Sequence, residues 1–475
     1  MKKSELVFVP VPALGHLTST IELAKHLLDQ DERLSITVLL IPPLGGTDLG
    51  SYTKSLAASD ARIRYTMIPP TNHLSQPPSS PMAFEKFASL FIESHKSHVE
   101  RAVMELLSDD STRLVGFVLD MFCCCMIDVA NTFKVPSYII FSSNTVFLGF
   151  LLHLPERNNK GEFNFNPSDP DSVIPCLKNP VPANVLPGAA LDKPGGGYET
   201  FLYLGTRFQE SKGIIINSFV ELEPYAVNSM VSHPITVYPV GPLLDHKINH
   251  NKSTESTEIK NWLDNQPSKS VIFLCFGSMG SFKQPQIEQI AMALEKSDHR
   301  FLWSMRQPPP EGMHGAPTDY TSYEKVLPNG FLARVKDRGM VCGWAPQVEV
   351  LAHEAIKGFV SHCGWNSILE SLWYGVPIAT WPLNAEQQMN AFYMVRELGL
   401  AVELSLAYRS SRSEIVMADQ IKTAINCLMD DTNPMRERVK KISEESRKAF
   451  IKGGSSLVTL GKLVEDMLEN LGEIQ

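Results

Sequence analysis

Short apolar runs alternate with longer amphipathic stretches along the first half of the chain. The runs are rich in Val, Ile and Leu and nearly continuous, which is typical of parallel strands that are buried on both faces. They predict strands at residues 6–11, 36–41, 63–68, 114–119, 137–141 and 213–217. The stretches between them have helical spacing and predict helices at residues 18–28, 84–107 and 123–133.

A polar stretch at residues 245–257 interrupts this pattern, which then starts again. Further strands are predicted at residues 271–276, 301–305, 340–342, 359–361, 378–381 and 400–402, and closing helices at 434–451 and 455–470. Two such arrays predict an α/β protein with two Rossmann-like, doubly wound domains. We expect the first domain at residues 1–245, a linker at 246–255 and the second domain at 256–454.

Length, charge and hydropathy narrow the class of protein. A chain of 475 residues exceeds what one ordinary hydrophobic core supports, which agrees with two domains. The net charge of −9 disfavours a nucleic-acid-binding protein that relies on a broad basic surface. No apolar run reaches the roughly 20 residues of a membrane span. Pro10 and Pro12 break the N-terminal run, which predicts a strand and loop rather than a signal peptide.

Cysteine usage bears on the compartment and on metal binding. Three of the eight cysteines are adjacent, at positions 123 to 125, and none has the spacing of a disulfide framework or of a metal site. We therefore expect a cytoplasmic protein. His95 and His98 have a spacing that can bind metal on a helix, but no third ligand is near in sequence, and a surface or pocket-lining role is expected instead.

Candidate ligand-binding residues are most concentrated in residues 344–387, which read WAPQVEVLAHEAIKGFVSHCGWNSILESLWYGVPIATWPLNAEQ. Tryptophans, histidines and polar turns are concentrated here, directly after strand-like runs. In open α/β sheets ligands bind at the carboxyl ends of the strands. The segment therefore predicts one edge of a nucleotide site.

This segment resembles, over its whole length, the signature box of plant secondary-product UDP-glycosyltransferases. The matching pieces are Trp344 to Gln347, His362 to Asn366, and the pair Glu386 and Gln387. The resemblance implies the GT-B fold, with two facing domains and the active site in the cleft between them. It also implies that the last helix, 455–475, crosses back to the N-terminal domain.

A UDP-sugar has a flat base, a ribose diol and a diphosphate, and each needs different side chains. Trp344 can stack on uracil, and the backbone near Ala345 and the side chain of Gln347 can pair with base or ribose. A carboxylate can accept both ribose hydrogen bonds. Glu370 is the residue to which the resemblance gives that task, and it shares a helix face with Asn366.

The diphosphate needs backbone N–H groups. Gly364, Trp365, Asn366 and Ser367 follow a strand and open a helix, so their N–H groups are expected to point outward. The resemblance adds His362 as a phosphate contact. Gly277 and Ser278, after the strand 271–276, predict a second phosphate cradle, and Ser142 is expected to meet the phosphate or the sugar.

Glu386 and Gln387 close the box and are expected to contact the sugar. In the family a terminal glutamine accompanies the use of UDP-glucose, so glucose is the expected sugar. Asn384 departs from the commoner aromatic or aliphatic residue, and this departure lies two residues from the sugar contacts.

Sugar transfer to a hydroxyl needs a base, and His16 lies in the first strand-to-helix turn, where a histidine can do this work. Asp120 ends a buried strand on the same edge and can hold the imidazole. Both match the family's catalytic pair, so we expect an inverting O-glycosyltransferase.

The acceptor is expected to be a small apolar molecule with a hydroxyl, such as a flavonoid, another phenolic or a terpenoid. Candidate pocket walls are Leu14, Phe84, Phe122 and Phe147, with Phe150 beside them; the four phenylalanines are also ordinary core candidates. We expect a monomer that needs no metal or other cofactor, because the two Asp-x-Asp pairs of the chain do not follow strands.

Two other classes remain as alternatives. A Rossmann-type oxidoreductase or epimerase is disfavoured because Gly15 stands alone where a glycine-rich motif would be needed. A non-catalytic UDP-sugar-binding protein is disfavoured because the chain has both His16 and Asp120.

Overall fold

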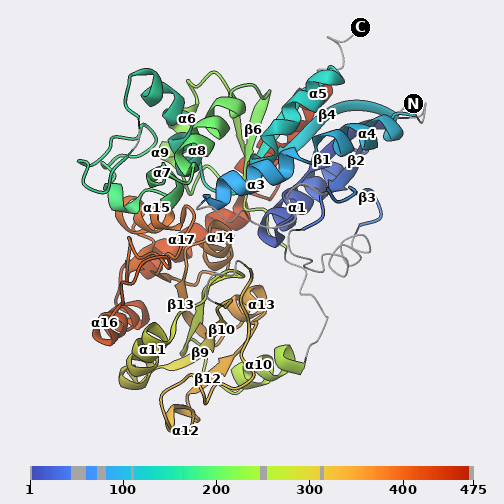
Figure 1. The fold of residues 1–475 in the computed structure, drawn as a ribbon. Helices are drawn as coiled ribbons and strands as arrows, with labels where there is room; N and C mark the ends of the chain where they lie inside the picture. Colours follow the sequence, from blue (N-terminus) through green and yellow to red (C-terminus); the bar gives the residue numbers. More distant parts are fainter. Residues whose placement is uncertain are drawn as a thin grey trace. The chain divides into compact units, whose positions relative to one another are not determined.

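The computed structural model describes residues 3–43, 60–71, 82–108, 112–163, 165–245, 254–310 and 315–469. Internal contacts divide the chain into two units, coloured along the sequence in Figure 1. The first unit comprises Met1–Ala183, Gly188–Asp245 and Lys448–Gln475, and the second comprises Asn184–Pro187 and His246–Arg447. The C-terminal segment thus joins the first unit from Lys448 onward. Most of the linker expected at 246–255 lies outside the described residues.

The first unit is built on a parallel sheet of seven described strands in the order β3-β2-β1-β4-β5-β6-β7. The strands are β1 (Lys3–Val9), β2 (Leu34–Leu40), β3 (Ile63–Met67), β4 (Thr112–Asp120), β5 (Ser137–Phe141), β6 (Gly213–Ile216) and β7 (Thr236–Pro239). Six were predicted, and β7 was missed because it is short, starts at an exposed residue and ends in proline.

Helices cover both sides of this sheet (Figure 1). The helices of this unit are α1 (Leu14–Gln30), α3 (Phe84–Glu93), α4 (Lys96–Leu106), α5 (Ile127–Thr132), α6 (Thr145–Asn159), α7 (Gly188–Leu191), α8 (Gly197–Phe208), α9 (Pro224–Met230) and α18 (Ser455–Glu469), with a 3-10 turn at Met121–Met126. A further 3-10 turn, Ala183–Val185, spans the boundary between the two units. Leu460, Leu463 and Met467 of α18 join the core of the first sheet. The Tyr238 hydroxyl of β7 donates to Asp466 Oδ2 at 2.6 Å, which fixes α18 on this unit.

Two predicted helices of the first unit are corrected by the structure. The helix expected at 84–107 breaks between α3 and α4, where the Ser94 hydroxyl and His95 Nδ1 both bond the carbonyl of Phe91, at 2.7 and 2.9 Å. Such side-chain bonds compete with the helix ladder. The helix expected at 123–133 begins earlier, as the 3-10 turn Met121–Met126, because the Asp120 carboxylate caps it by accepting from Phe122 N.

The second unit is built on a parallel sheet of six described strands in the order β12-β9-β8-β13-β14-β15. The strands are β8 (Val271–Cys275), β9 (Arg300–Ser304), β12 (Gly339–Cys342), β13 (Ile356–Ser361), β14 (Ile378–Thr380) and β15 (Ala401–Glu403). All six were predicted. A small antiparallel hairpin, β10 (Arg306–Gln307) with β11 (Thr318–Asp319), was not.

The helices of the second unit are α10 (Thr254–Asp264), α11 (Gln284–Ser297), α12 (Phe331–Val335), α13 (Gln347–Ala352), α14 (Trp365–Trp373), α15 (Gln387–Phe392), a π-helical turn (Tyr393–Glu397), α16 (Ala418–Met429) and α17 (Met435–Lys448). Most of them lie between successive strands of its sheet, with α10 before the first strand and α16 and α17 after the last. Across the described parts of both units, no helix is long and apolar enough to cross a membrane.

The strand order reverses direction once in each sheet, beside its first strand. The reversal falls between β1 and β4 in the first unit and between β8 and β13 in the second. In doubly wound sheets ligands bind at this point, outside the carboxyl ends of the strands. The predicted two-domain, doubly wound α/β architecture is confirmed, and it places the turns after β1, β4, β8 and β13 at ligand-binding positions.

Candidate active site

His16 and Asp120 meet at the switch point of the first sheet. His16 lies in the first turn of α1, directly after β1, and Asp120 is the last residue of the neighbouring strand β4. His16 Nδ1 is 2.8 Å from Asp120 Oδ2. The carboxylate is fully buried, whereas the His16 side chain is 27% exposed. A histidine open to solvent is thus held from behind by a buried acid.

This contact determines which nitrogen of His16 carries the proton. An ionised carboxylate only accepts hydrogen bonds, so Nδ1 must donate its hydrogen to Asp120. In the neutral ring Nε2 then has the lone pair and can accept a proton. Asp120 Oδ1 also accepts from Phe122 N at 3.1 Å, which fixes the carboxylate. Ser142 Oγ lies 3.0 Å from His16 Nδ1, so in this structure Ser142 contacts the histidine.

The apolar side chains predicted to line an acceptor pocket differ in exposure. The ring of Phe122 is 6.1 Å from that of His16. Leu14 is 39% exposed and Phe84 is 69% exposed, so both have free apolar surface. Phe147 and Phe150, by contrast, are core residues, because Phe147 packs on Phe141 and Phe201 and Phe150 packs on Phe165. Their expected place in a pocket wall stays a prediction.

In the second unit Trp344 follows β12 and is 46% exposed, a large exposed fraction for a tryptophan. The guanidinium of Arg306 lies 5.1 Å from its ring centroid. Arg306 is itself held by Asp319 at 2.8 Å and by the carbonyl of Pro317 at 2.6 Å. The indole is thus supported by a fixed cation. Arg306 was not predicted from the sequence, in which it is only a basic residue just after a predicted strand.

Three residues predicted to bind the UDP-sugar, Gln347, Ser367 and Glu370, contact one another. Gln347, the first residue of α13, donates from Nε2 to Ser367 Oγ at 2.8 Å and to Glu370 Oε2 at 2.7 Å. Burial raises the pKa of Glu370 to about 7, although the bond from Gln347 lowers it. Ala345, which directly follows Trp344 in the sequence, is buried. The carboxyl group is therefore held in place by a neutral amide and is close to its titration point at neutral pH.

The turns after β8 and β13 approach each other around His362. We call these two turns, with Gly277, Ser278 and residues 362–367, the His362 cradle. Gly277 has a φ of 74°, and a Cβ on it would lie 2.6 Å from His362 Nε2. A Cβ on Gly364 would lie 2.5 Å from the same atom, so both glycines are required by the close approach. Burial lowers the pKa of His362 to about 4. The imidazole is therefore neutral at pH 7.

The remaining residues of this cradle differ in exposure. Ser278 is exposed, Asn366 is half-buried, and the Trp365 side chain is 2% exposed, so Trp365 can offer only its backbone. Gly364 caps α14, whose first N–H groups therefore face the turn after β13.

At the sugar-reading end, Glu386 precedes α15 and is half-buried, and Gln387 is 9% exposed. The turn is joined to the loop after β13 by Asn390, whose Nδ2 donates to the carbonyl of Cys363 at 3.0 Å. Trp381 N donates to the Ser361 carbonyl at 2.8 Å. These bonds place the turn after β14 next to the His362 cradle. Asn390 was not anticipated from the sequence.

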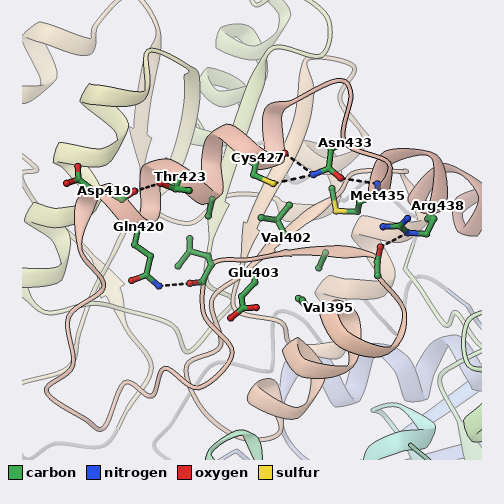
Figure 2. Close-up of a pocket in the computed structure, with 14 residues that line it drawn as sticks. Val395, Val402, Glu403, Asp419, Gln420, Thr423, Cys427, Asn433, Met435 and Arg438 are labelled. Carbon is green, nitrogen blue, oxygen red and sulfur yellow. Dashed lines mark hydrogen bonds between the residues drawn. The ribbon is translucent and has the colours of Figure 1, made fainter. Parts of the chain in front are cut away.

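A separate hollow of about 760 Å³ lies between β15, α16 and α17, and none of the predicted site residues lines it. Figure 2 shows Gln420 and Arg438 at two of its sides. Gln420 Nε2 donates to the Leu404 carbonyl at 2.8 Å and Arg438 Nε to the Gly399 carbonyl at 2.8 Å. The two side chains thus donate to carbonyls on either side of the edge strand β15. Such bonds make the edge less available for pairing with another strand.

Metal-ligating side chains do not gather in the described ranges, where no group of three or more His, Cys, Asp or Glu residues could hold an ion. His95 is fully buried rather than at the surface, with Nδ1 bonded to the Phe91 carbonyl. All eight cysteines are free.

Comparison with known proteins agrees with this geometry. Residues 231–444 match the family model described as UDP-glucoronosyl and UDP-glucosyl transferase. The chain is 46% identical to UDP-glycosyltransferase 71K1 of Malus domestica, over 98% of this chain and 99% of the relative. It is also 46% identical to UDP-glucose flavonoid 3-O-glucosyltransferase 6 of Fragaria ananassa, over 98% and 99%.

Among solved structures, the crystal structure of Medicago truncatula UGT71G1 complexed with UDP-glucose superposes with a TM-score of 0.89 at 44% identity, and 98% of each chain is covered. Fold and site thus define a glycosyltransferase of the GT-B class. More narrowly, the chain belongs to the UDP-glycosyltransferase family, and the resemblance stated from the sequence is confirmed.

Proposed function

We propose that the protein transfers glucose from UDP-glucose to a hydroxyl of a small phenolic acceptor, such as a flavonoid, and that it inverts the anomeric centre. The observation that carries the proposal is the contact of His16 Nδ1 with the buried Asp120 at 2.8 Å, at the switch point of the first sheet. The flavonoid glucosyltransferase from Fragaria ananassa and the UDP-glucose complex from Medicago truncatula support the donor and the acceptor class.

The base chemistry follows from the tautomer of His16. Nε2 takes the proton of the acceptor hydroxyl as the oxygen attacks the anomeric carbon of the sugar. The new C–O bond forms as the bond from this carbon to the diphosphate oxygen breaks, and UDP leaves with the electron pair. Asp120 stabilises the imidazolium that results and keeps Nδ1 protonated. Attack opposite the leaving group inverts the configuration.

We assign the donor to the second unit. Trp344 stacks on uracil, supported on its other face by Arg306. Glu370 accepts from the ribose hydroxyls, and Gln347 holds it in place. The diphosphate binds at the glycine turns after β8 and β13, where Gly277 and Gly364 leave room beside His362. Glu386 and Gln387 lie toward the sugar.

The acceptor is proposed to contact Phe122, whose ring lies 6.1 Å from that of His16, together with the exposed apolar side chains of Leu14 and Phe84. We also propose a metal-independent monomer in the cytoplasm; the free cysteines support a reducing compartment.

The test is an assay of the purified full chain with UDP-glucose and a panel of phenolic acceptors, with products read by mass. We expect a product heavier than the acceptor by one hexosyl group, and the same rate with and without EDTA. His16→Ala should abolish transfer while UDP binding persists, and His233→Ala, a histidine of the first unit outside the site, should not change the rate. Full activity in His16→Ala would contradict the assignment of the base, and strong EDTA inhibition would contradict metal independence.

A further inference from the structure

The turn before α15 fixes the orientation of two side-chain amides. Gln387 Oε1 accepts from the backbone N–H groups of Leu383 and Asn384, at 2.9 and 3.0 Å. A backbone N–H can only donate, so the oxygen of the Gln387 amide must face these two groups. Its nitrogen therefore faces Asn384, and Gln387 Nε2 donates to Asn384 Oδ1 at 3.0 Å.

This chain of bonds determines what Asn384 presents to a ligand. Its oxygen is occupied by Gln387, so its Nδ2 amide is directed elsewhere. Asn384 is exposed, and Nδ2 makes no hydrogen bond to any residue that the structure describes. Gln387, by contrast, is 9% exposed and uses its oxygen and one amide hydrogen within the turn. The accessible donor of this pair is therefore on Asn384.

The position of the turn indicates which part of a donor it meets. It follows β14, whose neighbour β13 leads into the His362 cradle, and Asn390 ties the two loops at 3.0 Å. With the diphosphate in that cradle, the next group of a UDP-sugar is the hexose.

A hydroxyl of the hexose at this position needs a hydrogen-bond donor from the protein. A sugar hydroxyl both donates and accepts, and the carboxylate of Glu386 can only accept. A hydroxyl whose hydrogen goes to a carboxylate still needs an N–H for its oxygen. We propose that Asn384 determines donor specificity by donating from Nδ2 to a hydroxyl oxygen of the transferred hexose, and that Gln387 is the residue that orients it. The inference rests on the proposed function.

Two substitutions at Asn384 separate this role from a purely structural one. Asn384→Asp keeps an oxygen that accepts from Gln387 Nε2 but cannot donate to a sugar, whereas Asn384→Ala loses both bonds. We expect both variants to lower kcat/KM for UDP-glucose about tenfold, with the Kd of UDP, which lacks the hexose, within twofold of the unchanged protein. Asn261→Asp makes the same chemical change at an exposed asparagine of α10 and should have no effect.

The outcomes discriminate between the ideas. If Asn384→Asp retains kcat/KM for UDP-glucose while Asn384→Ala loses it, Asn384 only holds the turn and the inference is wrong. The inference is equally wrong if both variants act like the unchanged protein. If UDP-galactose and UDP-xylose are used at the same rates as UDP-glucose before and after the change, Asn384 does not determine specificity. Absence of transfer from any UDP-sugar by the unchanged protein would instead contradict the proposed function.

Discussion

Replacing Glu370 with glutamine should stabilise the protein and weaken its hold on UDP. Burial raises the pKa of Glu370 from 4.5 to about 7. The folded state thus keeps the proton more tightly than the unfolded chain does, and stability falls as pH rises between these two values. Since one pKa unit corresponds to about 1.4 kcal/mol, the ionised carboxylate destabilises the fold by about 3 kcal/mol once the pH is above 7.

Glutamine does not titrate in this range, and its oxygen can still accept from Gln347 Nε2. The free energy of unfolding of Glu370→Gln should therefore exceed that of the unchanged protein by about 3 kcal/mol at pH 8 and by less than about 1 kcal/mol at pH 5. For a unit of roughly 200 residues this is a rise in Tm of about 6–12 °C at pH 8. Calorimetry at both pH values, on the transition of the second unit, measures it. Glu354→Gln, at an exposed glutamate, is the matched control.

UDP binding should change in the opposite direction. The ribose hydroxyls lose an ionised acceptor, and a hydrogen bond to a charged group is worth about 1.5–3 kcal/mol. The Kd of UDP should therefore rise about tenfold to a hundredfold, which isothermal titration calorimetry can measure. A glutamate kept for the fold alone would give the reverse pair of results, lower stability with unchanged UDP affinity. A gain in Tm that is equal at pH 5 and pH 8 would refute the argument from burial.

Three further substitutions test the rest of the site. Asp120→Asn should lower kcat by about a hundredfold or more and leave the Kd of UDP unchanged, because an amide can donate to His16 Nδ1 and stabilise the wrong tautomer; a normal kcat would exclude this role. Trp344→Ala should raise the Kd of UDP by about tenfold to a hundredfold through lost stacking, and an unchanged Kd would place the base elsewhere. Gly277→Ala should weaken UDP binding, because its Cβ would lie 2.6 Å from His362 Nε2. The control is Gly453→Ala: Gly453 has a φ of 87° but a Cβ on it would have nothing within 4 Å, so this change should lower Tm without affecting the Kd of UDP. Equal UDP affinities in the two variants would contradict the assignment of the diphosphate to the His362 cradle.

The sequence was sufficient for the sheets because parallel strands buried on both faces are continuous apolar runs. It failed where side chains compete with the backbone, as at Ser94 and His95, whose bonds to Phe91 end a helix that periodicity alone would continue. It also failed at β7, a short edge strand whose proline and exposed start hide its pairing with β6.

The candidate site was predictable as far as its residues follow strands, which is true of His16, Asp120 and Gly277. Arg306 was not predictable, because its contact with Trp344 joins the hairpin after β9 to the turn after β12. The fold creates this proximity, and no local pattern signals it. The bond between Gln387 and Asn384 is local, at a spacing of three residues, but its direction depends on backbone N–H groups whose orientation only the structure gives.

Protonation is the property of the donor site that a sequence conceals most. Burial lowers the pKa of His362 to about 4 and raises that of Glu370 to about 7, so both groups are held toward their uncharged forms. None of the residues assigned to the diphosphate is a lysine or arginine, so the diphosphate must rely on backbone N–H groups and a helix N-terminus. In a site of low polarity these fixed dipoles act more strongly than they would in water. The burial that makes Glu370 costly to ionise is therefore the same property that strengthens its bonds to a ribose, and the loss of stability at Glu370 and the affinity for UDP have one physical cause.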